Sequence, residues 1–122
     1  MRYRYTWSDR LHTKQDFSHV IRDGRRFSAS GLILWVYHDA SAQHGPRVGF
    51  AIPKAFGRAV DRNRIKRQLR EIFRLNKAFV AQGTDLVFAA RAMSTPMPYA
   101  VLESLVKTLW TKASIFPASS AS

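Results

Sequence analysis

The feature that most constrains the fold is a central segment that acquires two different faces when it is wound as a helix. Its apolar residues recur with a 3.6-residue period and predict a helix from about Val60 to Val80. The apolar stripe consists of Ile65, Leu69, Ile72, Phe73, Phe79 and Val80. A second face carries a cation at every fourth position, namely at Arg62, Lys66, Arg70 and Arg74. A helix of about 18 residues is ~27 Å long, so the apolar stripe must pack against a folded domain while the cationic row faces outward.

The charge of the whole chain is concentrated in this same segment. The 122 residues include 20 Lys and Arg against 8 Asp and Glu, a formal net charge of +12. Residues 54–77 hold nine basic side chains against two acids, Asp61 and Glu71, and are therefore +7. A helix face that serves only solubility would intersperse acids, because like charges at i, i+4 cost a few tenths of a kcal/mol each. We therefore expect a polyanionic partner, and nucleic acid is the commonest one.

The surroundings of this helix favour RNA over DNA. A helix that reads the major groove of DNA normally follows another helix through a tight turn, whereas this one follows an expected strand through residues 53–57. Side chains cannot easily enter the deep, narrow major groove of A-form RNA, so contacts to the backbone and to irregular regions are expected. The excess of arginine over lysine favours forked contacts to phosphates or base edges.

A shorter helix is expected near the N-terminus. Thr13 is a plausible N-cap, and Asp16 three residues later makes an acidic variant of the capping box. Gly24 is expected to end this helix. Its apolar face consists of Phe17, Val20 and Ile21. Periodicity alone favours Phe17 as a core residue.

Three apolar stretches are expected to form strands: 32–37, 48–52 and 85–90. The first two are expected to pair as antiparallel neighbours, and the third is apolar enough to be central. Val48, Phe50 and Ile52 share one face, while Gly49 and Ala51 leave the other face shallow. A shallow face near Trp35 or Tyr37 suits a nucleotide base, and it suits packing against a helix equally well.

A last helix is expected to open at 95–98, with a core-facing stripe of Leu102, Leu105, Val106, Leu109 and Trp110. Residues 116–122 are expected to be a frayed tail. Residues 1–122 then form one α+β domain.

Several classes of site and location are disfavoured by composition. Cysteine is absent, which excludes disulfides, thiol catalysis and cysteine-ligated metals. The four histidines lack metal-ligand spacing and are expected at the surface. No apolar run approaches the ~18 residues of a spanning helix, and no secretory signal is expected. We therefore expect a cytoplasmic protein without a metal site of its own.

Residues 52–74 resemble the signature of the bacterial ribonuclease P protein family. The matching pattern is Lys54, then Gly57-Arg58-Ala59-Val60-Asp61-Arg62-Asn63-Arg64-Ile65-Lys66-Arg67, then Arg70, Phe73 and Arg74 on the same helix. Flanking matches are Arg10-Leu11 before Asp16-Phe17, Arg47-Val48-Gly49, and residues 85–91. The resemblance implies a two-layer α+β domain of order α-β-β-β-α-β-α. It also implies a four-stranded sheet, an additional strand near Arg25–Ala29 and a left-handed crossover around the basic helix.

The resemblance also implies a division of labour. The RNA subunit of ribonuclease P holds the catalytic Mg²⁺ ions and removes the 5′ leader of precursor tRNA, whereas the protein contributes no catalytic residue. Contacts with the catalytic RNA are expected from Arg58, Arg62, Asn63, Arg64, Lys66, Arg67, Arg70 and Arg74. A cleft for the leader is expected at Phe17, Trp35, Lys54 and Phe50. The resemblance leaves undecided whether the holoenzyme dimerises.

Two positions depart from the family pattern. A second basic residue often follows the lysine, but Ala55 stands here, so one phosphate contact is expected to be missing. A second aromatic residue is common one turn after Phe17, whereas this chain has Ile21, so leader stacking is expected to be weaker.

Two other function classes compete with this interpretation. A structural RNA-binding protein of the ribosomal type, without a role in cleavage, has a similar composition. A cationic membrane-surface protein is the third class, but it would need a Trp- and Leu-rich amphipathic basic helix that this chain lacks.

Overall fold

The computed structural model describes residues 10–11, 13–42, 44–91 and 98–113. Helices, 3₁₀ turns (η) and strands follow in the order α1 (Lys14–Asp23), β1 (Arg25–Ala29), β2 (Leu32–His38), β3 (Arg47–Ala51), η2 (Lys54–Phe56), α2 (Ala59–Asn76), η3 (Lys77–Phe79), β4 (Thr84–Ala90) and α3 (Tyr99–Ala113). The α+β class is confirmed, and β1 lies where the family resemblance placed it. Thr95–Met97 and the tail 116–122, on which two predictions fall, are outside the described residues.

The strands form one mixed sheet of order β1-β2-β4-β3. β2 pairs antiparallel with β1 and β4, whereas β3 pairs parallel with β4. The predicted antiparallel pairing of residues 32–37 with 48–52 is therefore wrong, because β4 lies between these strands. β4 is buried along almost its whole length and occupies the centre, as predicted. The chain passes from β3 to β4 through α2, and the left hand of this crossover stays a prediction.

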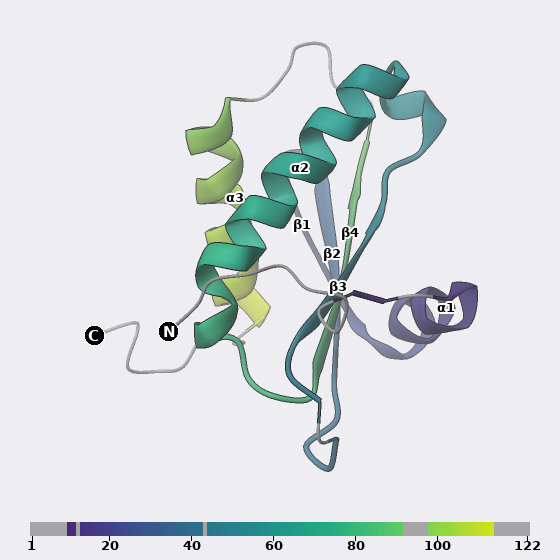
Figure 1. Ribbon diagram of the computed structural model, residues 1–122, viewed down its shortest axis with the longest axis vertical. Helices are drawn as coiled ribbons and strands as arrows, with labels where there is room; N and C mark the ends of the chain where they lie inside the picture. The colour runs from purple at the N-terminus through teal and green to yellow at the C-terminus, as the bar shows by residue number, and fades with distance from the viewer. Residues whose placement is uncertain (1–9, 12, 43, 92–97, 114–122) are drawn as a thin grey trace.

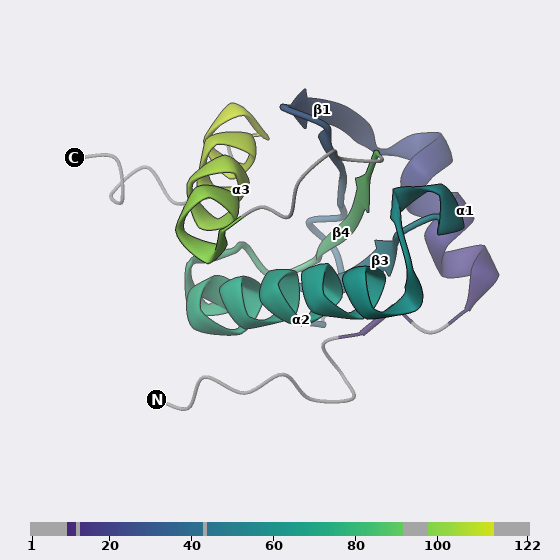
Figure 2. The same ribbon diagram turned by 90° about the horizontal axis from the view of Figure 1, so that it is seen from above.

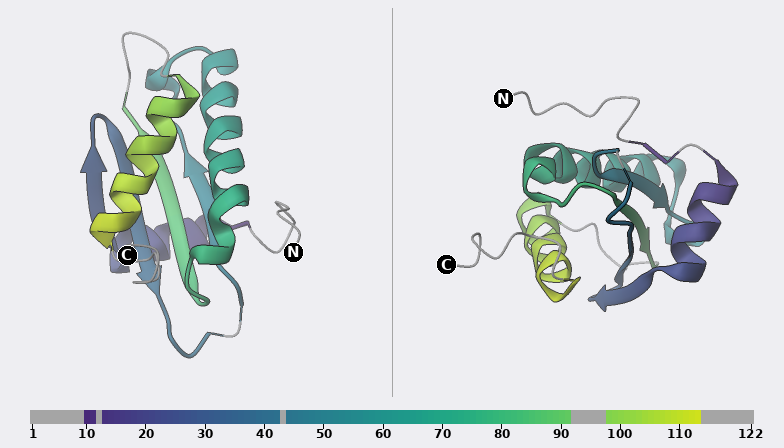
Figure 3. Two further views of the ribbon diagram at one scale, coloured as in Figure 1. Left: turned by 90° about the vertical axis from the view of Figure 1, so that its left-hand side faces the viewer. Right: turned by 90° about the horizontal axis from the view of Figure 1, so that it is seen from below.

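Helices cover the two faces of the sheet unequally (Figure 1, Figure 3). α2 and α3 lie side by side on one face, which we call the core face. α1 crosses the other face, which we call the α1 face, and adds a partial layer to the two that were expected. No helix within the described ranges is long and apolar enough to cross a membrane.

The main core joins α2 and α3 to the core face of the sheet. It contains Leu32, Leu34, Leu86 and Phe88 from the strands, Ile65, Leu69, Ile72 and Phe73 from α2, and Leu102, Val106, Leu109 and Trp110 from α3. Leu105 packs against this cluster while remaining partly exposed. The stripes predicted for both helices are therefore confirmed except at Phe79, which is 48% exposed. The α-helix ends at Asn76, and the tighter turn η3 breaks the 3.6-residue period before Phe79.

α1 begins and ends as predicted. The Thr13 hydroxyl accepts from the Asp16 N–H at 3.0 Å, and the Asp16 carboxylate accepts from the Thr13 N–H at 3.2 Å. Gly24 ends the helix, where an added Cβ would lie 2.4 Å from the Val20 carbonyl oxygen. Val20 is fully buried, but Ile21 is 39% exposed, so its assignment to the packed face is wrong. The helix presents only a narrow apolar edge to the sheet.

Candidate nucleic-acid interface

The start of α2 is held by a local network within the basic motif. The Asp61 carboxylate accepts from the Arg58 N–H at 3.1 Å and thereby caps the helix. The Arg62 guanidinium donates to the Gly57 carbonyl at 2.7 Å. A Cβ at Gly57 would lie 3.1 Å from the Asp61 carboxylate, so glycine leaves the room that the cap requires. The acid and the glycine in the motif therefore set the position of the helix, and the guanidinium groups of Arg58 and Arg62 take part in the same network.

The predicted RNA contacts on α2 differ in how much of their charge is already engaged. Asn63, Arg64 and Arg67 are exposed, whereas Lys66 and Arg70 are half-buried along the flank of the helix. Arg74 forms a two-pronged ion pair with Glu71, including a hydrogen bond of 2.9 Å from Nε. This hydrogen bonding lowers the pKa of the Glu71 carboxyl and raises the pKa of Arg74. The cations of α2 that are most accessible to a partner are therefore Arg64 and Arg67, which lie beside the cationic row.

The α1 face carries the predicted cleft residues Phe17 and Trp35. Both pack against a small apolar cluster of Leu11, Val20 and Val87. The Phe17 ring lies directly over Gly49, where an added Cβ would approach ring atoms to 2.5 Å. Trp35 is opposite Val87, which is opposite Gly49, so these residues form one row across the sheet. The shallow side of β3 is therefore used for an aromatic ring of α1, as one of the two alternatives predicted.

The next row of the α1 face, towards the end of β3, is partly exposed. It consists of Ile33, Ala89 and Ala51 in register across β2, β4 and β3. Two of these side chains are methyl groups, so the surface stays low beside the Phe17 and Trp35 rings. A low apolar surface bordered by aromatic rings suits the flat face of a base.

Phe50 does not lie on this surface, so the structure does not bring it together with Phe17 and Trp35. Its ring lies on the core face, stacked on Phe88 with centroids 6.3 Å apart. The period-2 alternation of a strand puts it opposite to Gly49 and Ala51. Lys54 is exposed in η2, and the segment between β3 and α2 bulges to the side of the sheet on which α1 lies (Figure 1, Figure 2).

Sequence reasoning from the residues alone missed β1 and with it Arg26. The register of β1 places Arg26 directly opposite Trp35, and the side chain is exposed. Arg25 alternates to the core face, where its guanidinium donates to the Ala113 carbonyl at 2.8 Å and lies over the Phe27 ring. The alternation of Arg26 and Ser28 with Phe27 and Ala29 is the sequence signal that could have identified this edge strand.

β3 is anchored at its start by a partly buried ion pair. The Arg47 guanidinium donates two hydrogen bonds of 2.8 Å to the Asp85 carboxylate of β4. This hydrogen bonding raises the pKa of Arg47. On the other side of β3, the Leu11 N–H donates to the Val48 carbonyl at 3.1 Å. These contacts hold the strand that carries Gly49 under Phe17.

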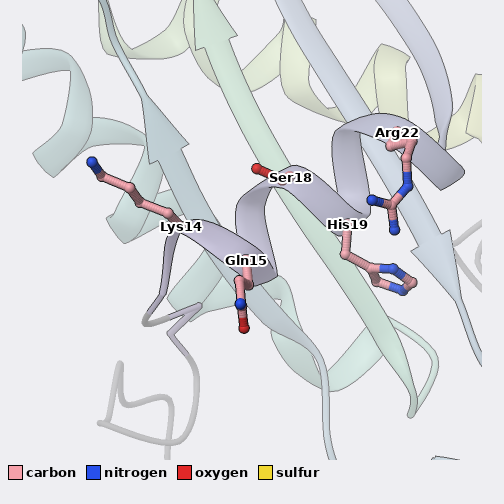
Figure 4. A pocket seen from close by; sticks show the side chains of 5 residues that line it. All are labelled: Lys14, Gln15, Ser18, His19 and Arg22. Carbon is pink, nitrogen blue, oxygen red and sulfur yellow. The ribbon is translucent and has the colours of Figure 1, made fainter.

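A shallow hollow of about 420 Å³ lies on the solvent side of α1. It is lined by Lys14, Gln15, Ser18, His19 and Arg22. Figure 4 shows α1 crossing in front of the strands, with Ser18 and Gln15 pointing to opposite sides of the helix. The residues that line it are polar or basic, but Asp23 already pairs with Arg22 at 3.1 Å and with His19 at 3.0 Å. Its cationic character is therefore reduced.

The described acids do not fit a magnesium centre. No group of three or more metal-ligating side chains comes together among the described residues. Each described carboxylate instead contacts a donor of the protein: Asp16 contacts the Thr13 N–H, Asp23 contacts Arg22, Asp39 contacts Ser41, Asp61 contacts the Arg58 N–H, Glu71 contacts Arg74, Asp85 contacts Arg47 and Glu103 contacts Lys107. His12 lies outside the described residues, His38 is exposed, and His19 and His44 are half-buried beside Asp23 and Asp85.

Comparisons with known proteins agree on one family. The pattern of the ribonuclease P family matches residues 6–114. The "Ribonuclease P protein component" of Clostridium kluyveri is 38% identical over 109 residues, covering 88% of this chain and 96% of that protein. That of Finegoldia magna is 36% identical over 107 residues, covering 88% and 92%.

Solved structures of the same family share the fold. The RNase P protein of Staphylococcus aureus superposes with a TM-score of 0.79 at 24% identity, covering 89% of this chain and 98% of that one. The protein from Thermotoga maritima superposes with a TM-score of 0.73 at 24% identity, covering 84% and 96%. The basic motif, the arrangement of the sheet and these matches together show that the chain belongs to the ribonuclease P protein family.

Proposed function

We propose that this chain is the protein component of a cytoplasmic ribonuclease P holoenzyme, which removes the 5′ leader of precursor tRNA. The observation that carries the proposal is the exposure of the family motif along the outer side of α2, with its apolar stripe buried. A cationic helix about 27 Å long suits the phosphates of a folded RNA. The partner of α2 is then the catalytic RNA subunit, bound chiefly by Asn63, Arg64, Lys66, Arg67 and Arg70.

The α1 face is the proposed binding surface for the leader. Phe17 and Trp35 border the low surface of Ile33, Ala51 and Ala89, onto which single-stranded bases can stack. Lys54 in η2 supplies a cation near the end of β3. Ile21, one turn after Phe17, is exposed and carries no aromatic ring, which supports weaker stacking than in relatives with two aromatics.

The chemical step belongs to the RNA subunit in this proposal. Mg²⁺ ions bound mainly by that RNA supply the charge stabilisation for phosphodiester cleavage. The protein holds substrate and catalytic RNA together, which lowers the entropic cost of reaching the reactive arrangement. Its residues contribute binding and orientation, and none acts as an acid, base or nucleophile.

Reconstitution with a bacterial ribonuclease P RNA at low Mg²⁺ tests the proposal. We expect the protein to increase leader removal, and the double variant Arg64→Ala/Arg67→Ala to lose most of this increase. The matched control Lys107→Ala/Lys112→Ala removes the same charge from α3 and should retain it. An unchanged rate on addition of the wild-type protein would contradict the proposal, and co-purification with ribosomal RNA instead of precursor tRNA would favour a structural ribosomal role.

Salt dependence gives a second measure of the same interface. With ~6 phosphates engaged at ~0.7 ions each, the logarithm of the affinity for the RNA subunit should fall against the logarithm of salt with a slope near −4. A flat response would exclude an electrostatic interface on α2.

A further inference from the structure

We propose that Arg26 binds a phosphodiester of the leader next to the base that stacks on Trp35. This inference rests on the proposed leader-binding function of the α1 face and adds a ligand for the backbone of the same strand. It concerns the edge strand β1, which contains neither the motif nor any of the predicted cleft residues.

The register of the sheet fixes where Arg26 stands. Residues directly opposite each other in an antiparallel pair share a face, and their Cβ atoms lie about 4.5–5.5 Å apart. Arg26 is opposite Trp35, so its side chain leaves the sheet beside the indole on the α1 face. One row therefore runs from Arg26 through Trp35 and Val87 to Gly49, which lies under Phe17.

The guanidinium of Arg26 is available to a ligand. The side chain is exposed, and it forms no ion pair or side-chain hydrogen bond with a described residue. The neighbouring arginines differ in this respect, because Arg25 donates to the Ala113 carbonyl and Arg22 is paired with Asp23. This arrangement suits a nucleotide. The base can stack on the half-buried indole of Trp35, and the guanidinium of Arg26 can donate two hydrogen bonds to the adjoining phosphate.

Arg26 also gives the leader surface a cation at each edge of the sheet. Lys54 follows β3 at one edge, and Arg26 lies on β1 at the other. Three strand spacings of about 4.8 Å separate the two edge strands, a width of roughly 14 Å. The leader would therefore cross the strands, with its bases over the low apolar row and its backbone held at both ends.

The test compares two precursor tRNAs bound by the reconstituted holoenzyme, one with a long leader and one with a single leader nucleotide. We expect Arg26→Ala to weaken binding of the long-leader substrate by about threefold and to make its salt slope shallower by about 0.7. Binding of the short-leader substrate should not change. Arg26→Lys should restore the slope because it keeps the charge, and Lys112→Ala, which removes one cation from α3, should match the wild type on both substrates.

The outcomes separate this inference from the function on which it rests. If Trp35→Ala loses affinity for the long leader while Arg26→Ala matches Lys112→Ala, the role of Arg26 is overturned and the leader surface stands. If the wild-type holoenzyme binds both substrates equally, the leader surface itself is wrong and the role of Arg26 fails with it.

Discussion

At the scale of single residues, the contact between Phe17 and Gly49 links the fold to the proposed leader surface. Gly49→Ala places a methyl group where the Phe17 ring now lies, 2.5 Å from its nearest atom. Phe17 is half-buried and can swing outward, so we expect a loss of about 1 kcal/mol in unfolding free energy, at the low end for overpacking. Urea unfolding measures this loss.

The displaced ring should affect only one of the two RNA interfaces. Affinity for a long-leader substrate should fall, whereas affinity for the RNA subunit alone should not change. Phe17→Leu serves as the control, because it removes the ring without adding volume under it. Equal losses at both interfaces would mean that Gly49→Ala disturbs the whole sheet.

Asp61 illustrates how an acid within a basic motif can serve the fold. Asp61→Ala removes the cap of α2, and we expect the free energy of unfolding to fall by about 1 kcal/mol. Glu103→Ala also removes one negative charge, but Glu103 forms only a loose, partly exposed pair with Lys107 at 3.9 Å, so its effect should stay within about 0.5 kcal/mol. Urea unfolding distinguishes the two, and similar values for both variants would refute the capping role.

At the scale of elements, the cations of α2 differ in how much of their charge is already offset: Arg64 and Arg67 are exposed, whereas Arg74 pairs with Glu71. Arg64→Ala and Arg67→Ala should each make the salt slope for RNA-subunit binding shallower by about 0.7–0.9. Arg74→Ala should change the slope less, because Glu71 already offsets its charge. Filter binding across a salt series measures all three slopes. A larger change for Arg74→Ala would mean that the RNA displaces Glu71 from this pair.

The start of β3 depends on its ion pair with β4. Asp85→Asn leaves the Arg47 guanidinium partly buried without its carboxylate, and we expect a loss of about 2–3 kcal/mol in unfolding free energy. The expected loss of unfolding free energy is smaller than for a fully buried ion pair, because the Arg47 side chain is 28% exposed. Replacing both residues by leucine should recover much of the loss. A double variant as unstable as Asp85→Asn would show that the pair itself is favourable.

The elements that sequence reasoning found are those with strong local signals. The capping box of α1 joins residues three apart, and the stripe of α2 repeats every three to four residues, so both patterns can be recognised in the sequence. The prediction that Phe79 belongs to the buried stripe was wrong, because the α-helix gives way to a tighter turn after Asn76 and the 3.6-residue period ends there. β1 is only five residues long and half polar, and it gains its stability from pairing with β2, which lies beyond the reach of a local pattern.

At the scale of the whole molecule, the strand order could not be read from the residues. Residues 32–37 and 48–52 are both apolar and follow each other in the chain, which favoured pairing them directly. The structure instead places β4 between them, after the chain has crossed the core face through α2. The side of the sheet to which Phe50 points follows from this arrangement and from its contact with Phe88. The prediction that grouped Phe50 with Phe17 came from the family resemblance, although the alternation along 48–52 already set Phe50 on the face opposite to Gly49 and Ala51.

The sheet separates the two proposed RNA interfaces, and this separation has a measurable consequence. Arg67 lies on α2 beyond the core face, and Trp35 lies on the opposite face. Sites without shared partners usually act independently within about 0.5 kcal/mol, which is roughly a twofold change in affinity. We therefore expect Arg67→Ala to weaken binding of the RNA subunit and, once the holoenzyme is saturated, to leave the leader-length dependence of substrate binding unchanged.

Trp35→Ala should reduce the leader-length dependence of substrate binding and leave the affinity for the RNA subunit unchanged. The double variant Trp35→Ala/Arg67→Ala should show both losses in full. Titration of the RNA subunit and titration of the two precursor tRNAs measure the two effects separately. If Trp35→Ala weakens RNA-subunit binding by more than about twofold, the catalytic RNA must reach around the sheet to the α1 face. The leader and the catalytic RNA would then share one continuous interface.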